Sequence, residues 1–223
     1  MTFSITLVIV LLTCAASIGA FSQPKIMNDM IFYGPAIKYN RQYYRFLSNG
    51  FIHGDYPHLI FNMIALYSFG EGLELSLYSY DCYLGSLGKL FYVLLYVLGL
   101  LVSSIPDYIK HQDDEHYRSL GASGAVSAVV FATIVLAPKL EVGFPMVDRL
   151  KIPGYIYGVV YLIITAYLDR KGGGRINHGA HLWGALFGIV FTVVSVMLLG
   201  KVDFWQNFLD GLKATPPHLL PSC

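Results

Sequence analysis

Long apolar segments alternate with short polar stretches along the whole chain. A membrane-spanning helix needs about 20 mostly apolar residues. Six segments approach that length, and they are residues 3–21, 58–77, 88–105, 121–137, 154–168 and 181–199. No repeat of fixed period and no low-complexity linker divides the chain. The pattern therefore predicts one all-α membrane domain over residues 1–223 with six transmembrane helices.

The first apolar segment, residues 3–21, has two interpretations. The small residues Ala15 to Ala20 near its end also fit the cleavage region of a secretory signal peptide. A signal peptide begins with basic residues, and no Lys or Arg precedes this segment. We therefore favour a membrane anchor, residues 1–21, as the first transmembrane helix.

Two further segments are too polar to span the membrane. Residues 22–57 contain three prolines and several aromatic side chains, which predicts a first loop lying at or in the membrane interface. Residues 201–223 have an amphipathic pattern of Phe, Trp and Leu, so we expect this tail on the membrane surface.

Composition supports the membrane interpretation. Hydrophobic residues make up 55% of the chain and charged residues only 13%, whereas soluble domains carry about 25% charged residues. These values argue against a soluble enzyme, a nucleic-acid-binding protein and a disordered chain. The formal net charge of +1 gives no reason to expect a polyanionic partner. Lys and Arg are so evenly distributed that the positive-inside rule does not fix the orientation.

Polar residues within the apolar segments are the candidates for function, because they are costly inside a membrane. His58 and Asn62 lie near the start of the second predicted helix, Ser123 near the start of the fourth and His181 near the start of the sixth. Even-numbered helices cross the bilayer in the same direction. We therefore expect these four side chains at one membrane face and at a similar depth.

Small residues flank two of these candidates. Ser123 lies in Gly121-Ala122-Ser123-Gly124, and His181 is followed by Gly184 and Gly188. Such stripes let helix backbones approach closely, which is what a Ser–His hydrogen bond of about 2.6–3.2 Å requires. In the second helix, His58 and Asn62 are four residues apart and project from one face.

This set of residue types favours acyl transfer. Ser123 would be the nucleophile, and His181 the base that removes its proton and later protonates the leaving amine. The Ser123 backbone N–H, the Asn62 amide and a His58 ring N–H are candidate donors to the oxyanion. No Asp or Glu is a clear third member, so we expect a dyad without a cofactor.

Each residue also has an ordinary structural explanation. A lone Ser in a membrane helix usually bonds to its own backbone, and a lone His at a helix start usually lies at the interface, which is our expectation for His53 and His178. A metal site built from His53, His58, His178 and His181 is a weaker alternative, because no H-E-x-x-H motif accompanies them.

Taken together, these motifs resemble the rhomboid family of intramembrane serine proteases. The matching pieces are the Gly121–Gly124 box, Ala180-His181 followed by Gly184 and Gly188, and His58 with Asn62. Tyr44-Arg45 in the first loop and Glu74 after the second helix match the family more weakly. The resemblance covers about residues 40–200, and it depends on the combination, since a lone G-x-S-G also occurs in soluble hydrolases.

The resemblance implies a six-helix rhomboid-like bundle with a Ser123–His181 dyad in a water-filled cavity open to the extracytoplasmic side. It implies that Arg45 and Glu74 are structural. The implied substrates are single-pass transmembrane proteins with small or helix-breaking residues near the cleavage site. A compact chain without a targeting extension favours a bacterial inner membrane. The oligomeric state is not indicated.

One departure concerns the base. Many family members carry an aromatic residue four positions after the nucleophile, where it packs on the catalytic imidazole, and this chain has Ser127 there. Position 127 therefore does not supply the aromatic support for His181 that the family pattern implies.

Two other functions compete with proteolysis. One is a rhomboid-like protein that binds membrane clients without cleaving them, although such proteins usually lack the Ser or the His. The other is a small transporter or channel, which we rank last because the chain lacks paired membrane carboxylates and an inverted repeat.

Overall fold

The computed structural model describes residues 4–144, 147–172 and 177–213. The helices in this part of the chain are α1 (Ile5–Ser22), α2 (Pro24–Met30), α3 (Gly34–Asn40), α4 (Arg45–Ser48), α5 (Tyr56–Gly72), α6 (Gly88–His111), α7 (Ser123–Leu136), α8 (Gly154–Lys171), α9 (His178–Leu199) and α10 (Phe204–Lys213). Short 3₁₀ turns occupy η1 (Asn49–Phe51) and η3 (Gly85–Leu87), and one π-helical turn, η2 (Leu73–Leu77), extends α5. All six predicted helices are present, and the expected all-α membrane fold is confirmed.

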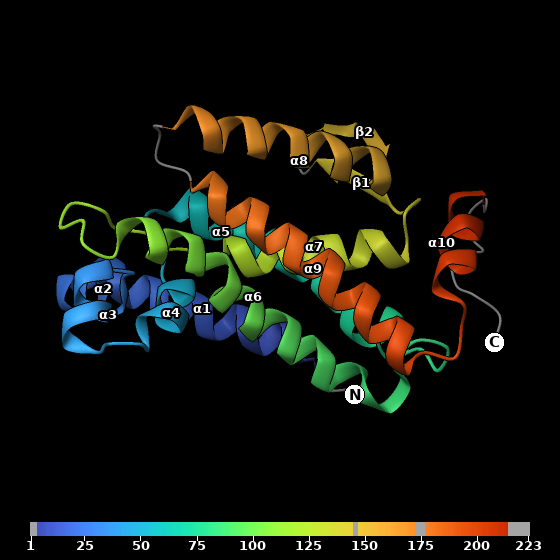
Figure 1. Cartoon of the computed structure of the whole chain (residues 1–223), viewed down its shortest axis with the longest axis horizontal. Coiled ribbons are helices and arrows are strands. Elements are labelled where there is room, and N and C mark those ends of the chain that lie inside the picture. Colours follow the sequence, from blue (N-terminus) through green and yellow to red (C-terminus); the bar gives the residue numbers. More distant parts are fainter. Residues whose placement is uncertain (1–3, 145–146, 173–176, 214–223) are drawn as a thin grey trace.

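The structure differs most from the prediction in two places. Helix α6 continues six residues beyond the expected end at 105 and contains Pro106 in its interior. Between α7 and α8 an unexpected antiparallel hairpin forms from β1 (Glu141–Phe144) and β2 (Val147–Pro153), with Glu141 opposite Pro153 and Val142 opposite Ile152. The hairpin is short and lies outside the helical bundle (Figure 1).

Three helices of the described residues are long and apolar enough to cross a membrane on their own, namely Ile5–Ser22, Gly85–His111 and His178–Leu199. Helix α7 has only 14 residues, which corresponds to about 21 Å at 1.5 Å per residue. The hydrocarbon core of a bilayer is about 30 Å thick. Helix α7 is therefore too short to reach both membrane faces.

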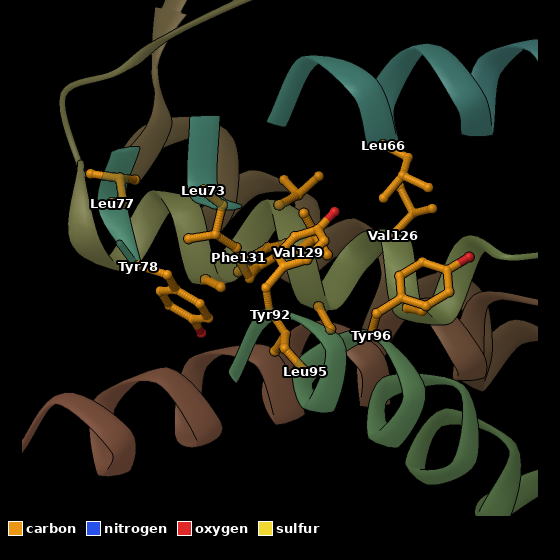
Figure 2. Packing of buried hydrophobic residues seen from close by; sticks show 14 of the residues in the cluster. Leu66, Leu73, Leu77, Tyr78, Tyr92, Leu95, Tyr96, Val126, Val129 and Phe131 are labelled. Atoms are coloured by element: carbon orange, nitrogen blue, oxygen red, sulfur yellow. The ribbon is translucent and has the colours of Figure 1, made fainter. Parts of the chain in front are cut away.

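The helices alternate in direction (Figure 1). Helices α5, α7 and α9 run one way and begin at the same end of the bundle, whereas α1, α6 and α8 run the other way. Helix α7 lies in the middle, and every residue from Gly124 to Ile134 is buried. The cluster of buried hydrophobic side chains in Figure 2 surrounds this helix, with Leu66 and Leu73 on one side of it and Leu95 and Tyr96 on another.

Backbone-to-backbone contact joins α7 and α9. A Cβ atom added at Gly184 would lie 2.1 Å from the carbonyl oxygen of Gly124, and one added at Gly188 would lie 2.3 Å from that of Ala128. Neither distance is compatible with a methyl group. Helix α8 packs more loosely on the same central helix, because Cβ atoms at Gly154 and Gly158 would lie 3.3 Å from the side chains of Ile134 and Phe131.

Two buried charged residues, Glu74 and Arg45, hold the start of α1 and the first loop in place. The Glu74 carboxylate accepts hydrogen bonds from the backbone N–H groups of Ile5 and Thr6, both at 2.8 Å, at the first turn of α1. A carboxylate is favourable there because the first N–H groups of a helix lack intrahelical partners. The Arg45 guanidinium donates to the carbonyl oxygens of Asn28 and Ile31 at 2.8 and 2.6 Å, which ties α4 to the rest of the first loop.

The polar segments fold into short helices. Residues 22–57 form α2, α3, α4 and η1, packed near the starts of α5 and α7. In the C-terminal segment, α10 buries Phe204 and leaves Trp205 58% exposed, and residues 214–223 lie outside the described part. The interfacial placement of both segments stays a prediction.

Candidate active site

A cavity of about 980 Å³ opens at the end of the bundle where α5, α7 and α9 begin. His58, Asn62, Ser123 and His181 all line it. Residues separated by more than a hundred positions in sequence therefore meet in one space, as the direction of the even-numbered helices predicts. Arg45 and Glu74 do not line this cavity.

Ser123 is the first residue of α7. The N–H groups of the first helical turn have no partner within the helix, and they carry the positive end of the helix dipole. The Ser123 hydroxyl and its backbone N–H therefore stand together at a helix start inside the cavity. This is a favourable place for negative charge to develop.

Gly121 shapes the turn before the serine. Its φ is +119°, in the region that favours glycine, and its N–H donates to the Asn49 carbonyl oxygen at 2.9 Å. A Cβ atom at this position would lie 2.8 Å from Cε1 of His58. The backbone conformation thus favours glycine, and any side chain there would also have to displace the His58 imidazole.

His58 and Asn62 occupy the first two turns of α5. Asp55 caps this helix, because its side chain accepts the His58 N–H at 2.8 Å, and Pro57 follows in the first turn, where the missing N–H is harmless. The Asn62 Nδ2 donates to the His58 carbonyl oxygen at 2.9 Å. A carboxamide carries two N–H donors, so this bond leaves one for a ligand.

His181 lies in the first turns of α9. Asn177 caps this helix by accepting the Ala180 N–H at 2.9 Å, and its carbonyl oxygen accepts the His181 N–H at 3.4 Å. Within the described residues, neither the His181 ring nor the Ser123 hydroxyl makes a hydrogen bond. The structure therefore shows both groups in one cavity without the Ser–His hydrogen bond that the sequence predicts. Catalytic hydrogen bonds are often long without substrate and tighten when it binds.

Sequence reasoning missed Asp107. It lies in the part of α6 beyond the expected helix end, and it lines the cavity. Its carboxylate accepts hydrogen bonds from the Tyr117 hydroxyl at 2.7 Å and from the Asn177 side chain. Asn177 in turn caps the helix of His181. Asp107 thus holds the start of α9 in place rather than contacting the imidazole.

His53 is completely buried inside the protein, and its position at the membrane interface stays a prediction. Its Nε2 accepts the Ala122 N–H at 3.3 Å, so in the neutral ring Nδ1 carries the proton. Nδ1 then donates to Ser17 Oγ at 3.0 Å, and Ser17 donates to the Phe51 carbonyl oxygen at 3.1 Å. This chain of bonds fixes the Gly121–Ala122 peptide, one residue before Ser123. His178, for which the same expectation was stated, lines the cavity.

Replacing His53 by Phe is expected to destabilise the fold by about 1–3 kcal/mol near neutral pH, because the buried Ala122 N–H loses its acceptor. Burial, with a smaller effect of the nearby His58, lowers the pKa of His53 to about 3, and Asp55 partly opposes this shift. The unfolded value is about 6.5.

Between those values only the unfolded chain binds the proton, so the contribution of His53 declines as the pH falls from about 6.5 towards 3. The stability difference between wild type and His53→Phe should therefore narrow between pH 7.5 and pH 4.5, as measured by thermal unfolding in detergent. A difference that stays constant or widens would contradict this assignment.

The histidines do not gather into a metal site. The rings of His53 and His58 lie 4.9 Å apart, and those of His178 and His181 lie 6.1 Å apart. Across residues 4–144, 147–172 and 177–213, no group of three or more His, Cys, Asp or Glu side chains is arranged to hold a metal ion.

Comparison with known proteins agrees with this architecture. The family model of the rhomboid domain matches residues 40–198. RHOMBOID-like protein 12, mitochondrial, of Arabidopsis thaliana is 27% identical over 184 residues, which cover 74% of this chain and 50% of the relative. Presenilin-associated rhomboid-like protein A, mitochondrial, of Danio rerio is 29% identical over 178 residues, covering 75% and 43%.

A bacterial relative is more distant. Rhomboid protease AarA of Providencia stuartii is 21% identical over 176 residues, covering 72% of this chain and 58% of the relative. The chain thus spans about half the length of the curated relatives it matches. The domain match covers well over half of the chain and includes the starts of α5, α7 and α9 with His58, Asn62, Ser123 and His181. The chain is an integral membrane protein and belongs to the rhomboid family.

Proposed function

We propose that this chain is an intramembrane serine endopeptidase, with Ser123 as nucleophile and His181 as general base. The observation that carries the proposal is the shared cavity, which collects a hydroxyl, an imidazole and candidate oxyanion donors from three helix starts. No single segment supplies this set, and structural roles alone do not explain why all four side chains face one space.

The short central helix supports the same proposal. Because α7 measures about 21 Å against a hydrocarbon core of about 30 Å, its two ends cannot both reach the membrane surface. In this proposal the Ser123 end of α7 is the one that lies below the surface, and the cavity that Ser123 lines supplies it with water. A hydrolase that acts on membrane segments needs both properties.

The chemistry then follows from the residues present. Ser123 Oγ attacks the carbonyl carbon of the scissile peptide while His181 takes the hydroxyl proton. The Ser123 N–H, with Asn62 and His58, stabilises the tetrahedral oxyanion. Collapse breaks the C–N bond, His181 protonates the leaving amine, and the acyl group stays on Ser123. Water, deprotonated by His181, then attacks this ester, the bond between the acyl carbon and Ser123 Oγ breaks, and His181 returns the proton to Ser123 Oγ as the new carboxyl group leaves.

The proposed substrates are transmembrane segments of single-pass proteins. The peptide bonds of an intact helix are shielded and already hydrogen-bonded, so the segment must unwind locally before attack. Small or helix-breaking residues near the cleavage site facilitate this step. The extracytoplasmic orientation of the cavity belongs to the same proposal. A bacterial inner membrane stays a prediction, since relatives of the chain include mitochondrial proteins and a bacterial protease.

The decisive test combines two readouts on the purified full-length chain in liposomes. The first is cleavage of a panel of single-pass substrates whose membrane segments contain Gly or Pro, with the cut mapped by mass spectrometry. The second is covalent labelling by a fluorophosphonate, with the modified residue identified. We expect cleavage within or beside the membrane segment and labelling at Ser123. Substrate binding with neither cleavage nor labelling would replace the proposal with a non-proteolytic binding protein.

A further inference from the structure

Two aromatic rings lie near the His181 imidazole, His178 edge-on to it at 6.1 Å and Tyr161 nearly parallel to it. Tyr161, from the middle of α8, has its ring centroid 6.4 Å from that of His181, and the two planes are inclined by only 15°. Both side chains line the cavity. Nearly parallel rings at this separation are within the range of favourable aromatic contact.

Tyr161 is itself held by the helix of the nucleophile. Its hydroxyl lies 2.8 Å from Ser127 Oγ, one turn after Ser123 on α7. Its ring also packs against Phe131 of α7, with centroids 5.4 Å apart, and against Tyr157 of α8 at 5.7 Å. Three contacts therefore fix the Tyr161 ring, two of them with α7.

Within the described residues no hydrogen bond holds the imidazole, and its other ring neighbour, His178, belongs to the same helix. In the described part of the chain, no carboxylate hydrogen-bonds to a ring nitrogen of His181, and Asp107 acts on the helix backbone through Asn177. A general base must present one nitrogen to the serine proton within a narrow range of geometry. A ring face lying along the imidazole restricts its rotation without consuming either nitrogen.

We infer that Tyr161 is the positioning residue of His181, and that Ser127 anchors it to α7. The inference rests on the proposed function. It also explains the side chain at position 127, because a large residue there would occupy the space that the Tyr161 hydroxyl fills. Helix α7, which carries Ser123, thus contacts His181 through Tyr161 of α8. It also packs directly on α9.

Kinetics in liposomes test the role. Tyr161→Leu is expected to lower kcat by about 10- to 100-fold with little change in KM, because substrate binding is intact but the base is misoriented. Tyr161→Phe keeps the ring and should lose much less activity than Tyr161→Leu. Ser127→Ala removes the same hydrogen bond as Tyr161→Phe, so each should cost about two- to tenfold and the double variant no more than either alone.

A spectroscopic readout tests the contact without catalysis. In protein labelled at histidine, the carbon-bound ring protons of His181 are assigned by comparison with His181→Gln. If they lie over the Tyr161 ring, Tyr161→Leu should move them downfield, while Tyr161→Phe leaves them nearly in place. The matched control is Tyr167→Leu, at a position on α8 that is 63% exposed and outside the cavity, which should change neither the signal nor kcat.

The outcomes separate the two proposals. If wild type neither cleaves nor labels, the proposed function fails, and the His181 signal still reports whether Tyr161 orients the ring. If wild type cleaves but Tyr161→Leu has unchanged kcat and an unchanged signal, the positioning role is overturned. A rise in KM alone would also overturn it, by making Tyr161 a substrate contact. If Tyr161→Leu fails to fold, additive effects of Tyr161→Phe and Ser127→Ala would reject the shared anchor.

Discussion

Alanine at position 123 is expected to abolish both substrate cleavage and fluorophosphonate labelling. Removing the nucleophile of a serine protease costs on the order of 10⁶-fold in kcat, which is below detection in a liposome assay. The fold should survive, because the Ser123 hydroxyl makes no hydrogen bond within the described residues and an alanine methyl occupies less space. The measurement is the initial rate of cleavage, together with the thermal unfolding midpoint in detergent.

His181→Ala should have an effect of similar size, because a serine without a base remains a weak nucleophile. Two controls match these variants. Ser195→Ala removes a hydroxyl from α9 that only bonds to the Phe191 carbonyl oxygen, and His116→Ala removes an exposed histidine outside the cavity. Both controls should cleave at nearly the wild-type rate. Full cleavage by Ser123→Ala would reject the nucleophile assignment outright.

Gly184→Ala is expected to disable the protein with a single methyl group. The new Cβ would lie 2.1 Å from the Gly124 carbonyl oxygen, and an atom pair that close forces the two backbones apart. Overpacking of this kind typically costs about 1–3 kcal/mol. The same displacement separates Ser123, next to Gly124, from His181, one turn before Gly184. Because a misplacement of about 1 Å can cost about 100-fold in rate, activity should fall further than stability.

Gly72→Ala provides the matched control. Gly72 lies at the end of α5, is exposed, and has no heavy atom within 4 Å of a Cβ added there. Alanine should be neutral or slightly stabilising at this site, because it loses less backbone freedom on folding than glycine. The test compares the unfolding midpoints and the labelling rates of Gly184→Ala and Gly72→Ala in detergent. A Gly184→Ala protein that matches Gly72→Ala in both would show that α7 and α9 are not in backbone contact.

The helices were predictable because the membrane imposes its own pattern. A segment such as α9 shows its apolar length directly in the sequence. The prediction failed where the structure does not follow a local sequence preference. Pro106 marks a probable helix end in soluble proteins, yet α6 continues through it to His111. The β1–β2 hairpin gave no usable signal, because it lies between two helices and forms no part of the bundle.

The cavity residues were predictable for a different reason. Counting the predicted spans is enough to place His58, Ser123 and His181 at the starts of even-numbered helices. No side-chain geometry is required. The residues that support them were not predictable in this way. His53 lies in a polar loop, and only the fold shows that it is buried against Ala122. Tyr161 is one of 17 tyrosines, and nothing in its local sequence distinguishes it from the others.

The burial of α7 has a consequence for which substitutions it can accept. A helix surrounded by other helices contacts protein instead of lipid. Its side chains therefore do not have to be as apolar as those that face the bilayer. What constrains residues such as Ala125 and Ala128 is volume: a single hydroxyl that bonds to its own helix is the most that fits there, while a long or branched side chain does not. Sequence drift in this helix should therefore exchange Ala, Ser and Gly more readily than Ala and Leu.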